Sequence, residues 1–184
     1  MSMPAASDRY YTRDEVLALP DDGNRYELVH GELLVSPSPG VPHQLVVSRL
    51  IGRLFEYVER TGAGRAFVSP ADISWGEPDL LLQPDVFVIA PAFARERRWE
   101  AMRHLSLCVE VLSPSTARYD RFTKRRLYQE RGVPLYWIID AGARRAEVWT
   151  PSSTVPTYEE VRLTWHPPEA PDPFTVELQW LLAP

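Results

Sequence analysis

The sequence predicts a mixed α/β domain in which helices pack on one sheet. Helical and strand-like segments alternate along the chain, which is typical of one sheet flanked by helices. Two apolar, β-rich runs, at 80–90 and 105–113, are typical of central strands buried on both faces. The chain has 184 residues, enough for one domain with a proper core and short for two, so we expect a single domain over residues 1–184.

Before residue 80, capping residues, glycine and proline indicate where the expected helices and strands begin and end. Thr12 and Glu15 have the spacing of a capping box, and Gly62 is a typical helix end. The expected elements are a short helix at 12–20, two strands at 25–38 around a turn at His30–Gly31, a long helix at 41–62 with apolar residues at helical spacing, and a strand at 64–75 in which Pro70 marks a bend or an edge.

After residue 80, two further strands and a second strong helix are expected around the apolar runs. The elements are strands at 80–90 and 105–113, a helix at 119–131, and strands at 134–140 and 145–150. Seven prolines occur among the 34 residues of 151–184, so we expect extended edge strands and loops there, and not a separate domain.

Composition and charge narrow the class of protein. Hydrophobic residues make up 45% and charged residues 24%, as in an ordinary soluble globular protein, and no apolar run is long enough to cross a membrane. The N-terminal stretch lacks a signal pattern and Cys108 is the single cysteine, so a cytoplasmic location is expected. The net charge of −5 argues against a protein that coats DNA without regard to sequence.

Positive charge is nevertheless concentrated in one part of the chain. Between Arg95 and Arg131, ten arginine and lysine residues stand against five carboxylates, so this segment carries +5 and the rest of the chain −10. A focused site for an anion is one interpretation of this pattern. A solvated helix face is the other, and charge alone favours it.

Two acidic residues interrupt the most apolar strands, Asp85 in the first and Glu110 in the second. Burying an isolated carboxylate is costly unless it is paired, hydrogen-bonded or bound to a metal. A buried ion pair with one of the many arginines, or a strand end that frays into solvent, explains each acid by itself. Carboxylates on neighbouring strands, however, can lie about 5 Å apart and repel each other unless a cation lies between them. Two carboxylates with a backbone carbonyl, for which Val111 is the candidate, suit Mg²⁺ or Mn²⁺.

Lys124 is the only lysine among 20 basic residues. It lies on the helix expected after the Glu110 strand, on the same face as Leu127 and Tyr128, and such a helix packs back on its sheet. Lys124 is therefore expected to reach toward the two carboxylates. Two acids, a lysine and a metal form an arrangement that hydrolyses phosphodiesters, in which the lysine orients or deprotonates water or neutralises developing charge. Arginine does this poorly because it stays protonated. Ordinary surface charge is the alternative.

These residues belong to a longer pattern. The strings "QPDVFVI", "LCVEVLSPST" and "YDRFTKRRLYQERGVPLYWIID" resemble the Uma-type restriction endonuclease family, within the PD-(D/E)XK nuclease superfamily. The resemblance covers about residues 10–150. It implies a restriction-endonuclease-like core with flanking helices and extra β hairpins, which hydrolyses DNA with a divalent metal. In the superfamily pattern the lysine stands two residues after the acid, where this chain has Leu112, so the lysine role passes to Lys124 on the following helix.

The resemblance also implies further site residues. Glu27 matches an acidic position of the family and is expected to complete the metal shell. His43 and Tyr128 also match family positions and are candidates for contacts with phosphate or water, although a capping histidine and a packed tyrosine are equally good interpretations. Arg121 and Arg125 remain available for phosphate groups or for solvent. The family string has an acid where this chain has Leu135, so a polar contact is expected to be missing there.

The functional expectation is a Mg²⁺- or Mn²⁺-dependent deoxyribonuclease that uses Asp85, Glu110 and Lys124, with DNA as partner and no membrane. A homodimer is expected by analogy, because two-fold symmetry suits a duplex. One alternative is a catalytically inactive module on the same fold, which binds nucleic acid or another protein. Another is a glycosidase-like carboxylate pair, whose acids face each other across a sugar-sized cleft.

Overall fold

The computed structural model describes residues 9–184. Residues 1–8, on which the expected lack of a signal pattern and the start of the domain partly rest, lie outside the described part. The elements, in chain order, are α1 (Arg13–Leu17), β1 (Asn24–Val29), β2 (Glu32–Pro37), α2 (Val41–Thr61), β3 (Arg65–Val68), β4 (Leu80–Leu81), β5 (Val86–Ile89), the 3₁₀ turns η1 (Pro91–Phe93) and η2 (Trp99–Ala101), β6 (Leu105–Val111), the π-helix η3 (Tyr119–Lys124), α3 (Arg125–Glu130), β7 (Tyr136–Asp140), β8 (Arg145–Trp149), β9 (Thr157–Glu159), β10 (Arg162–Trp165), β11 (Phe174–Glu177) and α4 (Leu178–Leu181).

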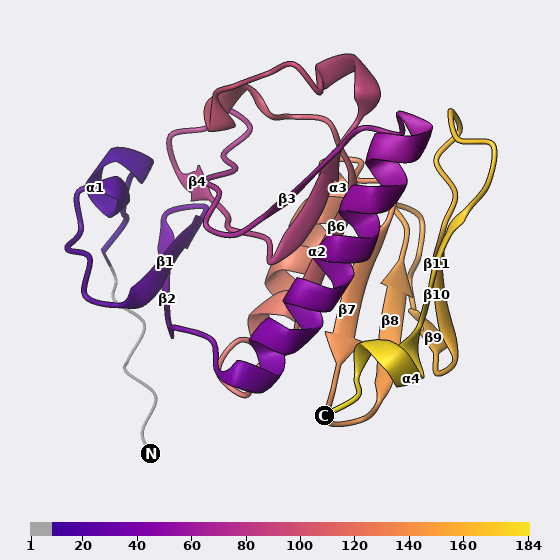
Figure 1. The fold of residues 1–184 in the computed structure, drawn as a ribbon. Coiled ribbons are helices and arrows are strands. Elements are labelled where there is room, and N and C mark those ends of the chain that lie inside the picture. Colours follow the sequence, from indigo (N-terminus) through magenta and orange to yellow (C-terminus); the bar gives the residue numbers. More distant parts are fainter. Residues whose placement is uncertain (1–8) are drawn as a thin grey trace.

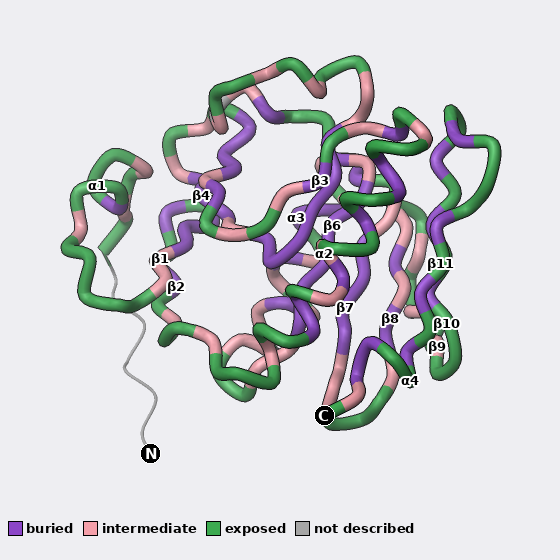
Figure 2. The backbone as a smooth tube through the Cα atoms, in the orientation of Figure 1, coloured by how far each residue is buried: buried purple, intermediate pink, exposed green. Residues whose placement is uncertain are grey.

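A six-stranded sheet forms the centre of the molecule, with strand order β3-β5-β6-β7-β8-β9. The β6–β7 pair is parallel and the other neighbours are antiparallel, which confirms the predicted mixed sheet. The inner strands β6 and β7 are largely buried, as the purple stretches of the tube beside their labels in Figure 2 show. The strands that flank them, β5 and β8, are largely buried as well. Because β6 and β7 are inner strands, a polar side chain on either one lies in the interior unless it is at a strand end.

The two faces of the sheet are covered by different elements. Leu107 and Val109 of β6 belong to a core that also contains the apolar side of α2. Cys108, on the opposite face of β6, belongs to a second core with Leu127 and Tyr128 of α3. The predicted alternation along β6 is therefore confirmed, and Glu110 lies on the α3 face of the sheet.

The long helix α2 crosses one face of the sheet (Figure 1). Its buried residues include Val46, Leu50, Leu54 and Val58, which repeat at helical spacing, and Gly62 ends the helix in the left-handed conformation. The C-terminal hairpin β10–β11 and α4 pack against the same helix. The last residues of the chain thus share the α2 core with the central sheet.

A smaller sheet, with order β2-β1-β4, stands beside the central one. The hairpin β1–β2 turns at His30 and Gly31, whose φ angles are 50° and 80°, and such positive angles at both turn positions match the twist of the strands. A Cβ at Gly31 would lie 2.2 Å from the Tyr10 ring, so this position requires glycine. The hairpin carries Arg25 and Glu27 toward the central sheet.

Some elements differ from those expected from the sequence. The run at 80–90 is divided, because Leu80–Leu81 pairs with β1 whereas Val86–Ile89 pairs with β3 and β6. The segment at 64–75 forms only a four-residue edge strand, β3. The helix at 119–131 begins as a π-helix, and the C-terminal segment ends in a short helix, α4, that the proline content did not predict. No helix in the described part of the chain could cross a membrane.

Candidate metal-binding and catalytic site

The pairing of β5 with β6 brings the two strand carboxylates together. Val86 pairs with Val109, and the antiparallel register continued by one residue places Asp85 opposite Glu110. Only 2% of Asp85 and 1% of Glu110 is exposed. The two acids therefore lie opposite each other on neighbouring strands of this sheet, as expected from the sequence.

Asp85 is held by three groups at the end of β5. Its Oδ2 accepts the backbone N–H of Val111 at 2.8 Å and lies 3.0 Å from Nε2 of His43, and its Oδ1 accepts a hydrogen bond from Arg25 at 2.9 Å. Burial by itself would raise the pKa of Asp85. The hydrogen bond with His43 and the positive charge of Arg25 outweigh burial, so the pKa is lowered and the carboxylate is ionised.

Glu110 shares its environment with Lys124. Nζ of Lys124 donates to Oε1 of Glu110 at 3.2 Å, and the hydroxyl of Tyr128 donates to the same oxygen at 3.3 Å. Burial raises the pKa of Glu110 well above its ordinary value, and the neighbouring Lys124 offsets only part of this effect. An additional positive charge would therefore stabilise the ionised form of Glu110.

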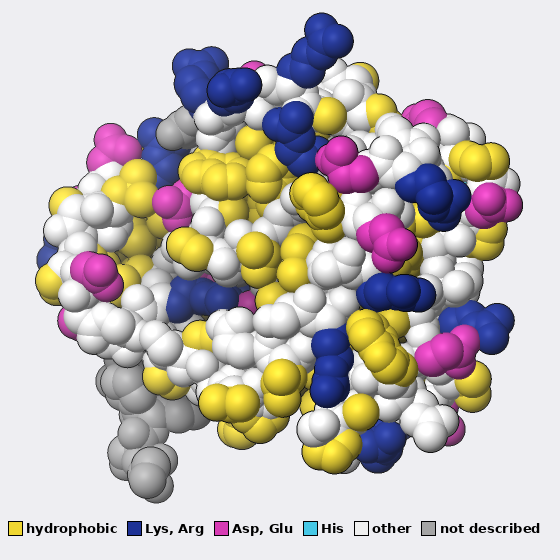
Figure 3. All heavy atoms as spheres, in the orientation of Figure 1, with side chains coloured by type: hydrophobic (Ala, Val, Ile, Leu, Met, Phe, Trp, Pro, Cys, Tyr) yellow, Lys and Arg dark blue, Asp and Glu magenta, His cyan; other side chains and the backbone are white. Residues whose placement is uncertain are grey.

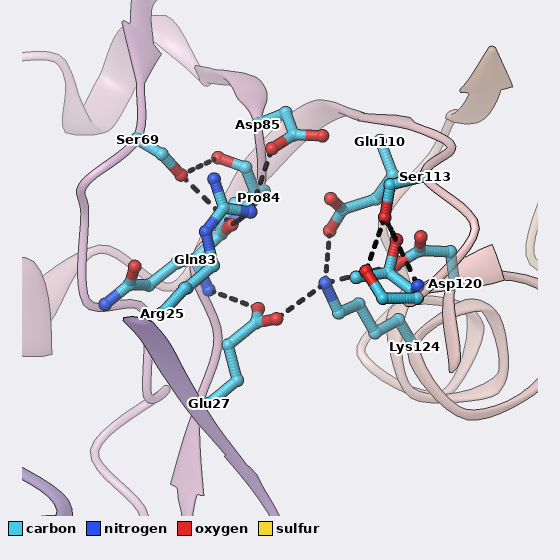
Figure 4. A network of polar contacts seen from close by, with 12 residues as sticks. Arg25, Glu27, Ser69, Gln83, Pro84, Asp85, Glu110, Ser113, Asp120 and Lys124 are labelled. Atoms are coloured by element: carbon cyan, nitrogen blue, oxygen red, sulfur yellow. Dashed lines mark hydrogen bonds and ion pairs between the residues drawn. The ribbon is translucent and has the colours of Figure 1, made fainter. Parts of the chain in front are cut away.

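Lys124 is 1% exposed and is surrounded by carboxylates (Figure 4). Its Nζ lies 2.8 Å from Oε2 of Glu27 and 3.1 Å from Oδ1 of Asp120, in addition to the contact with Glu110. Burial would lower the pKa of Lys124, but the three carboxylates together raise it well above the ordinary value. In this arrangement Lys124 is a cation, which suits charge neutralisation and orientation of water better than proton abstraction.

The π-helix η3 delivers Lys124 to this position. The N–H of Arg125 reaches the carbonyl of Asp120, five residues back, which widens the turn that contains Lys124. The hydroxyl of Tyr136, on β7, donates to the same carbonyl at 3.1 Å and ties the widened turn to the sheet. Asp120 and Lys124 are consequently both buried on the sheet side of this helix.

Arg121 and Arg125 face away from the carboxylate cluster. Arg121 is paired with Glu147 at 2.6 Å and with Asp140 at 2.8 Å. The guanidinium of Arg125 stacks over the ring of Trp149, 4.5 Å from its centroid. Both arginines thus have partners within the chain, on the surface formed with β7 and β8.

A hollow of about 210 Å³ gives access to the cluster. It is lined by Asp85, Glu110 and Lys124, by His43 of α2 and the segment 36–40 that precedes this helix, and by the loop at 113–116 that follows β6. Tyr128 does not line it and is completely buried, so its described contact is the hydrogen bond to Glu110. A small ligand in this hollow would meet both acids and serine and threonine hydroxyls.

The donor set fits a hard divalent cation. Four buried carboxylates, of Glu27, Asp85, Glu110 and Asp120, stand against the permanent charges of Lys124 and Arg25. The cluster therefore has an excess of negative charge and only oxygen donors besides His43, as Mg²⁺ and Mn²⁺ prefer. Within residues 9–184, however, no three His, Cys, Asp or Glu side chains are already arranged to hold a metal. A cation would have two carboxylates, Asp85 and Glu110, and would keep several waters.

Comparisons with known proteins show the family of the chain. The family model Uma2, described as "Putative restriction endonuclease", matches residues 13–183. This chain belongs to the Uma2 family. The match confirms the resemblance seen in the sequence and extends it from about residue 150 almost to the C-terminus.

A solved structure has the same fold. It is described as a putative nuclease belonging to DUF820 from Anabaena variabilis ATCC 29413, and it superimposes with a TM-score of 0.75 at 21% identity, covering 94% of this chain and 98% of that chain. No curated protein matches the chain. The fold expected of a Uma2 protein is thus confirmed, and the family relationship supports a nuclease.

Sequence reasoning missed two members of the cluster, Arg25 and Asp120. Arg25 stands two residues before Glu27 on β1, so strand alternation places both side chains on one face. Asp120 stands four residues before Lys124 and shares its helix face, but aspartate is also a common helix-capping residue. The sequence signals that could have identified them were the two-residue spacing of Arg25 from Glu27 and the four-residue spacing of Asp120 from Lys124.

Proposed function

We propose that this Uma2 protein is a Mg²⁺- or Mn²⁺-dependent endonuclease that hydrolyses DNA phosphodiester bonds. The observation that carries the proposal is the position of Asp85 opposite Glu110 at the end of the β5–β6 pair, with Nζ of Lys124 3.2 Å from Glu110. Paired carboxylates with a neighbouring ammonium at the edge of a hollow suit the hydrolysis of a phosphodiester.

In this proposal Asp85 and Glu110 bind the cation through their carboxylates. The carbonyl of Val111 is the third ligand, since the N–H of Val111 points toward Asp85 and the carbonyl of a strand residue points to the same side as its N–H. When bound, the cation supplies Lewis-acid activation of water and of the phosphate oxygen. Glu27 acts through Lys124, whose ammonium it contacts at 2.8 Å, or as a further ligand.

The remaining groups orient these ligands and the substrate. His43 and Arg25 hold Asp85 in its ionised form, and His43 also lines the hollow at the start of α2. Lys124 remains protonated, so its role is to orient water and to offset the charge that develops on the phosphate. Tyr128 orients Glu110 through its hydroxyl. The loop at 113–116 offers hydroxyl donors to phosphate oxygens.

The charge distribution on the surface affects how the protein would bind DNA. Basic and acidic side chains are interspersed over the face drawn in Figure 3, and the net charge is −5. Arg121 and Arg125 belong to this proposal only if DNA displaces their partners within the chain. A homodimer would present two hollows to the two strands of a duplex, and light scattering with and without DNA tests this part of the proposal.

The experiment is cleavage of supercoiled plasmid DNA in Mn²⁺ or Mg²⁺, with single-stranded DNA and RNA as parallel substrates. The native protein is expected to cut DNA, whereas Asp85→Asn and Glu110→Gln are expected to lose cleavage and metal binding together. Arg126→Met, an exposed residue on the same helix as Lys124, serves as control and keeps full activity. Failure of Mn²⁺ to bind in a manner that depends on Asp85 and Glu110 would overturn the proposal.

A second candidate is a catalytically inactive module on the same fold. One observation favours it: in the described structure both oxygens of Asp85 and one oxygen of Glu110 are already bonded to groups of the chain itself. If this candidate is correct, the protein binds DNA with equal affinity in EDTA and in Mn²⁺ and cuts neither plasmid nor single strands.

A further inference from the structure

Asp120 is a buried acid whose position the proposed function does not use. It is 1% exposed, and its Oδ1 lies 3.1 Å from Nζ of Lys124. This contact is ionic only, because Oδ1 accepts no aligned hydrogen bond from any described residue. A buried carboxylate oxygen without a hydrogen bond is uncommon and calls for an explanation.

The contacts of Lys124 indicate what Oδ1 of Asp120 could do. Among its three carboxylate contacts, the one to Oε1 of Glu110, at 3.2 Å, has the alignment of a hydrogen bond, whereas those to Glu27 and Asp120 are ion pairs. A cation on Glu110 would compete with the ammonium for this carboxylate. Lys124 is 1% exposed although it lines the hollow, so its ammonium depends on neighbouring carboxylates, and a displaced hydrogen bond needs another buried acceptor.

We propose that Asp120 is a positioning residue that takes over the Lys124 ammonium when a divalent cation binds Asp85 and Glu110. The inference rests on the proposed metal site. It assigns the four acids of the cluster to two pairs: Asp85 and Glu110 bind the cation, and Glu27 and Asp120 retain Lys124 beside it.

The geometry requires little movement for this exchange. Nζ lies between 2.8 and 3.2 Å from all three carboxylates, so reorienting the ammonium is sufficient to move its hydrogen bond from Glu110 to Asp120. The backbone of Asp120 is fixed, because its carbonyl accepts the N–H of Arg125 and the hydroxyl of Tyr136. Figure 4 shows Lys124 extended between Asp120 on its own helix and Glu27 on β1.

The charges are consistent with this assignment. With Lys124 on Glu27 and Asp120, and Arg25 on Asp85, the chain leaves Glu110 without a cation of its own. A buried carboxylate without a paired cation is unfavourable, and Glu110 is 1% exposed, so this state is stable only when a metal supplies positive charge. Without Asp120, only Glu27 would hold the ammonium away from Glu110, and the ammonium would compete with the metal for Glu110.

A double-mutant cycle on metal affinity tests the inference. Mn²⁺ binding is measured by calorimetry, without DNA, for the native protein, Asp120→Asn, Lys124→Met and the double variant. Asp120→Asn is expected to weaken Mn²⁺ binding about tenfold when Lys124 is present and less than about threefold in the Lys124→Met background. An equal loss in both backgrounds would mean that Asp120 acts on the metal by itself, which overturns the inference.

A second measurement does not depend on the stability of Lys124→Met. Because Lys124 is the only lysine, ¹⁵N-lysine labelling gives a single side-chain ammonium signal in NMR. Addition of Mg²⁺ to the native protein is expected to move this signal while its protons still exchange slowly with water. In Asp120→Asn the signal is expected to broaden and vanish on Mg²⁺ addition. The same slowly exchanging signal in both proteins overturns the inference.

The two experiments separate this inference from the proposed function. Absence of Mn²⁺ binding to the native protein contradicts both the metal site and the role of Asp120. Normal binding that depends on Asp85 and Glu110, together with no effect of Asp120→Asn on affinity or on the ammonium signal, leaves the metal site intact and removes Asp120 from it.

Discussion

Nζ of Lys124 lies 2.8 Å from Oε2 of Glu27, and 1% and 3% of these two side chains are exposed. The contact joins strand β1 of the small sheet to the π-helix behind the central sheet. Oε1 of Glu27 accepts the N–H of Gln83, two residues before Asp85, at 2.8 Å. One buried carboxylate therefore fixes the lysine and the strand that carries the first acid of the site.

Replacing Lys124 by methionine is expected to destabilise the metal-free protein. The change leaves Glu27, Glu110 and Asp120 buried without their shared cation, and breaking one partner of a buried ion pair costs about 3–5 kcal/mol. Urea unfolding in EDTA measures this loss, and Arg126→Met, exposed on the same helix, should unfold like the native protein. Added Mn²⁺ is expected to restore part of the stability. An unchanged unfolding free energy in EDTA would contradict the buried ion-pair cluster.

Glu110→Gln is expected to abolish cleavage and to leave the metal-free protein at least as stable as the native one. Burial raises the pKa of Glu110, so ionisation of this side chain opposes folding above the ordinary glutamate pKa, and a neutral amide removes that cost. Glu147→Gln is the matched control, because Glu147 is buried but paired with Arg121 away from the site. It should lose stability and keep cleavage. Urea unfolding in EDTA at pH 7, with plasmid cleavage, checks both variants.

Much of the site could be predicted, because the alternation of side chains along a strand and the order of consecutive strands and helices can be inferred from the local sequence. Asp85 and Glu110 stand in apolar runs that pair directly, and Lys124 follows on the helix that packs over them. The widened turn could not be predicted, since it depends on Tyr136, which arrives from β7 and bonds the carbonyl of Asp120. A π-helical turn is rare and occurs mostly as a single widened turn within an α-helix, so helical spacing in the sequence predicts the ordinary turn.

The ion-pair partners of the basic residues could not be predicted from sequence patterns either. Arg121 lies in a segment of high positive charge, yet its partners Asp140 and Glu147 come from later strands that the charge count does not join to it. Arg25 was missed because an arginine on an outer hairpin normally faces water. Its pairing with Asp85 exists only because the small sheet stands beside the central one.

The Arg121–Asp140 pair predicts a pH-dependent contribution to stability. Burial would raise the pKa of Asp140, but the N–H of Ala143 and the charge of Arg121 lower it below the ordinary value. A lowered carboxylate pKa stabilises the fold above the ordinary pKa of about 3.9, and this stability is lost as pH falls through the folded-state pKa. Asp140→Asn is expected to cost about 1 kcal/mol at pH 7, and the difference from the native protein should shrink progressively below pH of about 4. Urea titrations across this range, with exposed Asp14→Asn as control, measure the effect. A difference that stays constant below pH 4 contradicts the assignment.

Tyr128→Phe distinguishes a tyrosine that orients Glu110 from one that touches DNA. The side chain is 0% exposed and its hydroxyl donates to Oε1 of Glu110 at 3.3 Å, so removing the hydroxyl leaves this oxygen to Lys124 alone. The loss of one buried hydrogen bond, worth about 1 kcal/mol, is expected to weaken Mn²⁺ binding about fivefold, because Tyr128 orients Glu110. The KM for DNA should be unchanged, because Tyr128 does not line the hollow. Calorimetric Mn²⁺ titration and steady-state cleavage separate the two quantities, with Tyr158→Phe, an exposed tyrosine on β9, as control. A raised KM with unchanged Mn²⁺ affinity would instead assign Tyr128 to substrate binding.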